Sequence, residues 1–184
     1  MDNLLPQAYL IGLVLLLGVA AAVVARQIWR VRSDEVTLAR LERGGETGQS
    51  DDAAALYELA SVQLRKRFYS QAVDNLRKAL KLARAGGDPA DALALIENAL
   101  GFALAAQNNY KSAIRHYRSA LEARPDYPVA LNNLAYALDK QGSLEEASQT
   151  YRRVLELDAG NTTARKRLER LERTLETPAP QAGP

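Results

Sequence analysis

The side chains that most often carry out chemistry are scarce in this sequence and are not grouped. The chain has no cysteine and a single histidine, His116. Disulfides, thiolate zinc sites and cysteine nucleophiles are therefore excluded, and a transition-metal centre, which normally needs several histidine or cysteine ligands, is not expected. A Ser-His-Asp triad would have to use His116, which stands beside Arg115 and Arg118 in a helical segment. We expect His116 to be an ordinary solvated or packed helix residue.

Phosphate-binding and acid–base patterns are equally weak. Gly44-Gly45 and Gly86-Gly87 lack the Lys-Ser/Thr partner of a phosphate loop. The carboxylate pair Glu145-Glu146 is expected on the solvated surface of a helix. The 24 basic and 22 acidic side chains give a net charge of +2, which offers no basis for nucleic-acid binding. The sequence therefore predicts a protein that is not an enzyme and that uses no cofactor, metal or nucleic acid.

An uncharged stretch near the amino terminus predicts a membrane anchor. Residues 3–25 carry no charge, and as a helix rising about 1.5 Å per residue they would cross the hydrocarbon core of a bilayer. Tyr9 and Trp29 flank the apolar run, where amphipathic rings favour the membrane interface. We predict a transmembrane anchor with its basic flank over 1–32, which contacts membrane lipid through residues 3–25. A juxtamembrane helix and linker are expected over 33–52.

The charges around this stretch predict its orientation. Arg26, Arg30 and Arg32 all follow it, so the positive-inside rule places the amino terminus outside and the remainder on the cytoplasmic side or its equivalent. A cleaved signal peptide is the alternative, because Ala20-Ala21-Ala22 resembles a cleavage site. Such a peptide normally has positive charge before its apolar run, whereas this chain has Asp2 there.

Downstream of the linker, one pattern of small and large residues recurs. Ala113-x3-Tyr117-x2-Ala120 returns 34 residues later as Ala147-x3-Tyr151-x2-Val154, and an earlier copy contains Ala72-x3-Leu76 and Ala79. A 34-residue period of paired helices is the signature of the tetratricopeptide repeat (TPR). Its small residues let two antiparallel helices approach closely, and its large residues fill the space between them. The predicted TPR domain covers 53–176, with repeats at about 53–86, 94–127 and 128–161, a capping helix at 162–176, and a disordered tail at 177–184.

Two departures from the repeat pattern stand in repeat two. Glu97 occupies a large apolar position that Leu56 and Leu131 fill in the other repeats. The first junction is also seven residues longer than the second, and Asp88 as a cap with Pro89 behind it predicts an early start for the next helix. We therefore predict an all-α protein: an N-terminal transmembrane helix followed by a right-handed superhelix of three TPR helix-turn-helix repeats and a C-terminal capping helix.

The first helix of each repeat is expected to line a concave groove that binds partner proteins. Asn98-x3-Phe102 recurs as Asn132-x3-Tyr136, which places an amide and an aromatic ring on one face. An amide can pair with a peptide backbone and a ring can pack against a side chain. The alternative is that these residues only pack between repeats. The predicted partner-binding residues are Tyr57, Ser61, Arg65, Asn98, Phe102, Asn132, Tyr136 and Lys140.

Two other binding modes are less favoured. TPR domains that bind chaperone tails use a clamp of Lys and Asn, but the matching positions here hold Tyr57, Ser61, Ala99, Val129 and Asn133. The last helix is rich in arginine, but Glu169, Glu172 and Glu176 interleave, which favours a salt-paired surface over contact with anionic lipid.

The order of these features resembles a known family. An uncharged head, one apolar span, three repeats with a lengthened first junction, and motifs such as Ala99-Leu100-Gly101-Phe102-Ala103 and Pro125-Asp126-Tyr127 are similar to the thylakoid-anchored TPR photosystem I assembly factors of cyanobacteria and chloroplasts. The resemblance implies a thylakoid membrane protein whose clients are photosystem I subunits or assembly intermediates. A TPR scaffold for bacterial cell-envelope biogenesis or secretion is the alternative.

Overall fold

The computed structural model describes residues 12–28 and 52–176. Residues 12–28 form a helix whose side chains are all exposed. Among the described residues, no helix combines the length and the hydrophobicity that crossing a membrane requires. The predicted span begins at residue 3, so its first part lies outside the described residues, as do nearly all of the predicted juxtamembrane segment 33–52 and the predicted tail 177–184.

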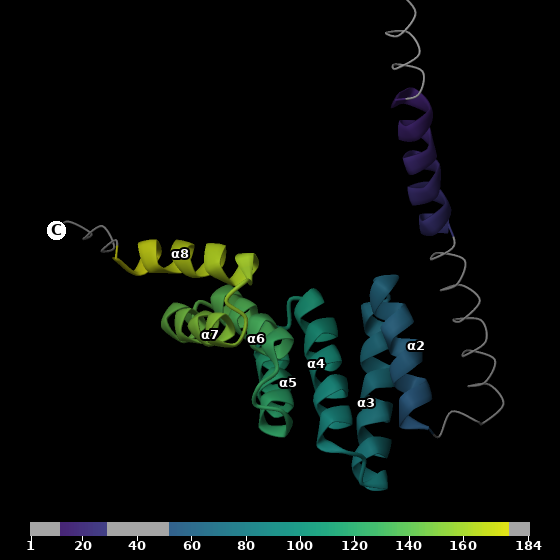
Figure 1. Cartoon of the computed structure of the whole chain (residues 1–184). Helices are drawn as coiled ribbons and strands as arrows, with labels where there is room; N and C mark the ends of the chain where they lie inside the picture. Colours follow the sequence, from purple (N-terminus) through teal and green to yellow (C-terminus); the bar gives the residue numbers. More distant parts are fainter. Residues whose placement is uncertain (1–11, 29–51, 177–184) are drawn as a thin grey trace, which may run out of the picture.

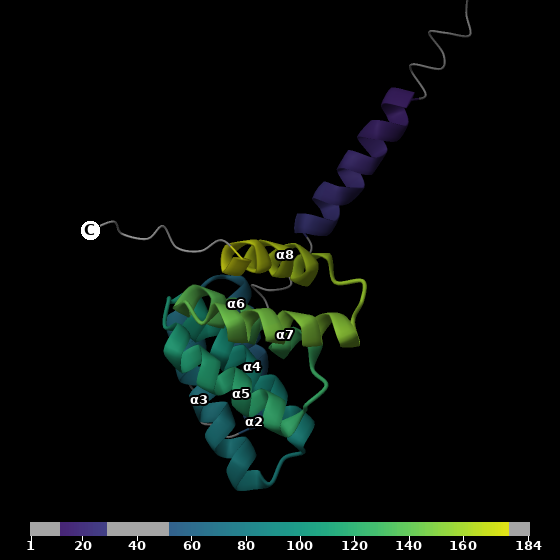
Figure 2. The same cartoon turned by 90° about the vertical axis from the view of Figure 1, so that its left-hand side faces the viewer.

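Within residues 52–176 the chain forms only α-helices and short connections. The helices are α2 (Ala53–Arg65), α3 (Tyr69–Gly86), α4 (Ala90–Ala106), α5 (Tyr110–Ala123), α6 (Pro128–Gln141), α7 (Leu144–Leu157) and α8 (Thr162–Glu176). Each helix packs mainly on the next one in the chain, so the array is a row of antiparallel hairpins that α8 closes (Figure 1). In Figure 1, helices α2 to α4 are nearly vertical, whereas α7 and α8 are nearly horizontal. The helix direction therefore rotates along the array, as it does in a superhelix. Figure 2 shows α8 lying against α7 at the end of this row.

The helix starts follow local capping chemistry. The Asp52 side chain accepts a hydrogen bond of 3.0 Å from the Ala54 amide, and Asn161 does the same for Ala164 at 3.0 Å. Helix α4 starts at Ala90, earlier than the repeat register alone would place it, but the predicted cap Asp88 is not used. Pro89 stands at the cap position in an extended conformation, and its carbonyl accepts the first helical amides.

The core is built from the recurring small and large residues. Tyr117 and Tyr151 in the second helices are almost fully buried, and Leu76 takes the same place in repeat one. Small residues face these positions: Gly101 lies against the ring of Tyr117, and Ala135 is completely buried in α6. One continuous cluster of buried side chains therefore runs from α2 to α8.

The turns inside the three hairpins share one backbone conformation. A residue with positive φ follows each first helix: Arg67 at 65°, Asn108 at 61° and Gly142 at 88°. These positions are equivalent in the repeat. Glycine and asparagine tolerate the left-handed region, whereas arginine there carries a steric cost.

Candidate partner-binding groove

The inner face of the array is lined by α2, α4, α6 and α8. The ring of Phe102 on α4 is 43% exposed, although its neighbours along the helix are buried. Val129 on α6 is 55% exposed and Leu95 on α4 is 37% exposed. Large apolar side chains left in contact with water on a preformed concave surface are suited to anchoring another chain.

Tyr136 lies at the centre of a cluster of rings and cations where α6 meets α8. The Arg167 guanidinium carbon lies 4.6 Å from the centroid of the Tyr136 ring, and Lys140 Nζ lies 5.7 Å from it. The Tyr110 ring meets the same ring edge to face, with centroids 6.4 Å apart. The structure thus brings together two predicted groove residues, Tyr136 and Lys140, and adds Arg167 and Tyr110, which sequence reasoning missed.

Arginine side chains of the capping helix α8 form ion pairs with α6, one of the helices that line the groove. Arg170 donates a hydrogen bond to the Asp139 carboxylate on α6, and Arg167 lies 3.9 Å from the same carboxylate. Arg152 of α7 pairs with Glu172 at 2.7 Å. Arg167, Arg170 and Glu172 of α8 therefore form ion pairs with residues of α6 and α7. Extending the 34-residue period from Asn133 into α8 reaches Arg167, and this was the signal that could have found it.

The two predicted asparagines occupy different environments. Asn98 is buried: its Nδ2 donates to the Tyr127 hydroxyl at 3.4 Å, and its Oδ1 accepts from Asn133 Nδ2 at 3.1 Å. Asn98 therefore links α4 to α6 beneath the groove surface and has no free amide group facing it. Asn132 is half-buried, and its Oδ1 has no hydrogen-bond partner among the described residues. Burial raises the pKa of Tyr127, as does Tyr57 nearby, while Arg124 and the Asn98 bond oppose the rise.

The repeat-one residues follow one face of α2. The Ser61 hydroxyl donates to the Tyr57 carbonyl at 2.8 Å, and Arg65 Nη1 donates to the Ser61 carbonyl at 3.3 Å. Tyr57 also lines a small cavity of about 120 Å³ between α2 and α4, together with Leu95. The cavity at this end of the groove has a mainly apolar lining, whereas the α6–α8 end presents Lys140 and Arg167.

Glu97 and His116 form a buried polar site that the sequence did not predict. The Glu97 side chain is only 3% exposed, and its two oxygens lie 2.6 Å from Arg84 Nη2 and 2.7 Å from His116 Nδ1. The carboxylate thus joins α3, α4 and α5 at the lengthened junction, where Leu56 and Leu131 fill the equivalent positions elsewhere. His116 is a structural partner of Glu97, and the expectation of an ordinary helix residue missed this contact.

Comparison with known proteins identifies the repeats and the fold. Tetratricopeptide repeat models match residues 51–126 and 104–171. Among solved structures, YrrB, described as a TPR protein with an unusual peptide-binding site, superimposes with a TM-score of 0.64 at 27% identity over 83% of this chain and 74% of that one. MamA superimposes with a TM-score of 0.67 at 16% identity, over 75% of this chain and 76% of that one, a likeness of fold alone.

The sequence relatives are more specific. The chain is 33% identical over 129 residues to ycf37 of Guillardia theta, which covers 70% of this chain and 71% of that protein. It is 31% identical over 128 residues to ycf37 of Cyanophora paradoxa, covering 69% and 72%. It is 33% identical over 120 residues to the chloroplastic tetratricopeptide repeat domain-containing protein PYG7 of Arabidopsis thaliana, covering 65% of this chain and 38% of that longer protein. These matches confirm the family resemblance drawn from the motifs, and the chain belongs to the ycf37 family of tetratricopeptide repeat proteins.

Proposed function

We propose that this protein is a membrane-anchored scaffold that binds protein segments in its TPR groove and assists the assembly or stabilisation of a membrane complex, namely photosystem I. The observation that carries the proposal is the exposed ring of Phe102 on the same inner surface as the Tyr136 cluster. The groove presents exposed apolar and cationic side chains, a surface suited to holding another chain. Photosystem I as the client complex rests on the family resemblance.

The anchor is supported by the helix over 12–28. Its apolar side chains are exposed all around, including Leu16 at 67% and Val19 at 65%, and a helix that is apolar on every side calls for a nonaqueous environment. Three arginines follow the apolar run. We therefore propose a single-pass protein of the thylakoid membrane, with the TPR domain on the cytoplasmic or stromal side. The Arabidopsis relative is a chloroplastic protein, which is consistent with this location.

The groove also suggests the chemistry of its client. Lys140 and Arg167 stand beside Tyr136, and Phe102 offers an apolar contact on the neighbouring helix. A segment that places an apolar or aromatic side chain next to an acidic one would satisfy both. The proposed contact surface is Tyr57, Ser61, Arg65, Phe102, Asn132, Tyr136 and Lys140, extended by Arg167, with Asn98 supporting it from beneath.

Removal of the protein tests the assignment to photosystem I. In cells that lack the chain, photosystem I should accumulate to a lower level, while other thylakoid complexes stay near normal. Quantification of each complex after growth in optimal light and under stress measures this. Normal photosystem I under both conditions would contradict the assignment and leave only an anchored scaffold for another complex.

A further inference from the structure

Repeat one carries an excess of basic over acidic side chains. Residues 53–86 hold seven basic and two acidic side chains, whereas residues 128–161 hold three basic and five acidic ones. Arg67, Arg77, Lys78 and Lys81 are exposed, and none of the four has an ion-pair partner among the described residues. A near-neutral chain thus concentrates unpaired positive charge on its first repeat.

Three of these side chains share the outer face of α3. The helix buries Ala72, Val73, Leu76, Ala79, Leu80 and Ala83. Arg77, Lys78 and Lys81 fall on the opposite, solvated side, where Asp74 is the single acidic residue of the helix. The equivalent helix α7 differs, because its Arg152 and Arg153 are neutralised by Glu172 at 2.7 Å and Asp126 at 3.2 Å. The outer face of α3 therefore keeps positive charge that its counterpart on α7 does not.

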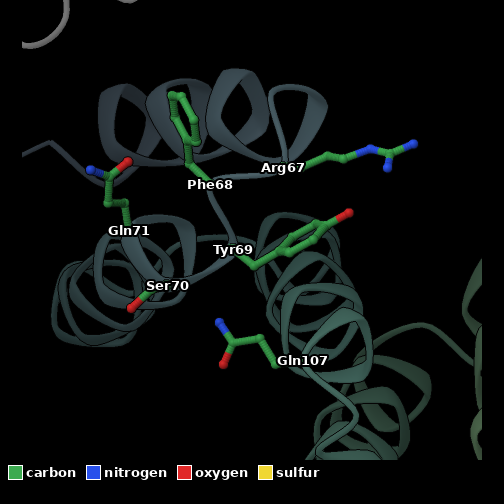
Figure 3. Close-up of a pocket in the computed structure, with 6 residues that line it drawn as sticks. All are labelled: Arg67, Phe68, Tyr69, Ser70, Gln71 and Gln107. Carbon is green, nitrogen blue, oxygen red and sulfur yellow. The ribbon is translucent and has the colours of Figure 1, made fainter.

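The α2–α3 turn adds aromatic side chains to the end of this face. Phe68 is 48% exposed, and the turn borders an open hollow of about 530 Å³ that reaches Gln107 on the far side. Figure 3 shows Arg67 and Tyr69 projecting from the turn to one side, with Phe68 turned toward α2. Arg67 also holds the left-handed conformation, with φ of 65°, that Asn108 and Gly142 adopt in the other repeats.

We propose that this outer face of repeat one, formed by Arg67, Arg77, Lys78 and Lys81, docks onto a membrane surface that carries anionic lipid headgroups. Basic clusters are attracted to such surfaces. The charges spread over an outer helix face instead of lining a cleft, which fits a broad polyanionic surface better than an acidic peptide. Because α3 is a second helix of its repeat, this docking leaves the inner groove open to clients.

The position of repeat one in the chain supports the same occupant. It is the first repeat after the apolar helix 12–28, separated from it by residues 29–51. Here the inference rests on the proposed anchor, because an anchored chain holds the TPR domain close to the bilayer surface and so raises the local concentration of lipid around it.

The absence of cysteine allows the test to be made on the full chain with single labels. Gln71→Cys reports on the proposed docking face and Gln149→Cys on the outer face of α7; both positions are exposed. Each variant carries a fluorescent dye and is reconstituted with vesicles of phosphatidylcholine, with or without phosphatidylglycerol, that contain a lipid-borne quencher. We expect quenching at position 71 in the anionic vesicles only, reversed by high salt, and no quenching at position 149.

Charge variants connect the signal to the named residues. Each basic side chain near an anionic surface strengthens association about fivefold, so Arg77→Gln, Lys78→Gln and Lys81→Gln together should weaken docking about a hundredfold. The matched control removes the exposed charges of Lys111, Arg115 and Lys166 and should leave quenching unchanged. Equal quenching in neutral vesicles, or equal loss in the control, would overturn the proposal.

Flotation of the vesicles separates this inference from the anchor. A chain that floats with both kinds of vesicle but shows no quenching at position 71 retains its anchor and overturns docking, leaving the basic face to an acidic protein. A chain that floats only with anionic vesicles overturns the anchor and supports docking. A chain that floats with neither overturns both.

Discussion

Gly101 and Tyr117 fit together without room for another atom. A β-carbon at Gly101 would lie 2.7 Å from Tyr117 Cε1 and 2.8 Å from its Cδ1, and the ring is almost fully buried. Gly101→Ala should therefore destabilise the TPR domain by about 1–3 kcal/mol, because the packed ring has to shift. Urea unfolding of the repeat domain 51–176 measures this.

Gly86→Ala is the matched control for that substitution. A β-carbon there would meet only the end of the Asp88 side chain, at 3.3 Å, and Gly86 does not have positive φ. This change should leave the unfolding midpoint unchanged or raise it. An equal loss of stability in both variants would show that the close packing of Gly101 on Tyr117 is not the cause.

Because Glu97 is buried, the stability of the TPR domain should depend strongly on the two side chains that pair with its carboxylate. Removing both Arg84 and His116 as alanine variants should lower the free energy of unfolding by about 3 kcal/mol, because the carboxylate loses its compensation. Adding Glu97→Leu, the residue type of Leu56 and Leu131 at the equivalent positions, should recover most of this loss. A triple variant no more stable than the double variant would contradict the pairing as the source of the effect.

Buried tyrosines predict a loss of stability in alkali. Burial raises the pKa of Tyr151 from 10.0 to about 12, against the opposing charge of Arg167. Below pH 10 the folded and unfolded chains both keep this proton; between pH 10 and 12 only the unfolded chain loses it, so stability falls as the pH rises. Tyr151→Phe should remove part of this fall and cost little at neutral pH, since the hydroxyl has no hydrogen-bond partner among the described residues. Melting temperatures that fall equally for the native chain and for Tyr151→Phe between neutral pH and pH 12 would contradict this prediction.

The proposed anchor predicts the behaviour of the chain in isolated membranes. The protein should stay with the membrane fraction after high-salt and alkaline washing, and the TPR domain should be open to protease from the cytoplasmic or stromal side. Immunoblotting of the fractions measures both. Release into the wash, or a mature chain that lacks residues 1–22 or 1–25, would instead support peripheral binding or a cleaved signal peptide.

The periodicity of the sequence was sufficient to predict the helical repeats, because the packing of each helix pair requires the same residue types at the same interval. Ala113 and Ala147 are completely buried where two helices touch, so each repeat needs the same small residue at the same interval. The early start of α4 was also predictable, although not its cap. Contacts between side chains that lie far apart in the sequence were not. From the sequence, Glu97 is only a departure from the repeat pattern, but in the structure its carboxylate contacts His116. Asn98 is expected on the groove surface, but in the structure its side chain is hydrogen-bonded to Asn133 and Tyr127. No local pattern encodes such pairs.

We propose that the rings of Phe102 and Tyr136 hold the client in the groove. The double variant Phe102→Ala with Tyr136→Ala should weaken client binding by about 2 kcal/mol or more, which is about thirtyfold in affinity, if these rings are binding hot spots. The control is Leu157→Ala on α7, an apolar side chain that is 41% exposed outside the groove. Helical circular dichroism and membrane association of both variants should match those of the native chain.

The most direct measurement is recovery of photosystem I subunits with the tagged full-length protein from solubilised membranes, in cells that express each variant in place of the native chain. We predict that the double variant loses these subunits and that its cells accumulate less photosystem I, while the Leu157→Ala protein behaves like the native one. A folded, membrane-bound double variant that recovers photosystem I subunits as well as the native protein does would contradict the groove as the client site.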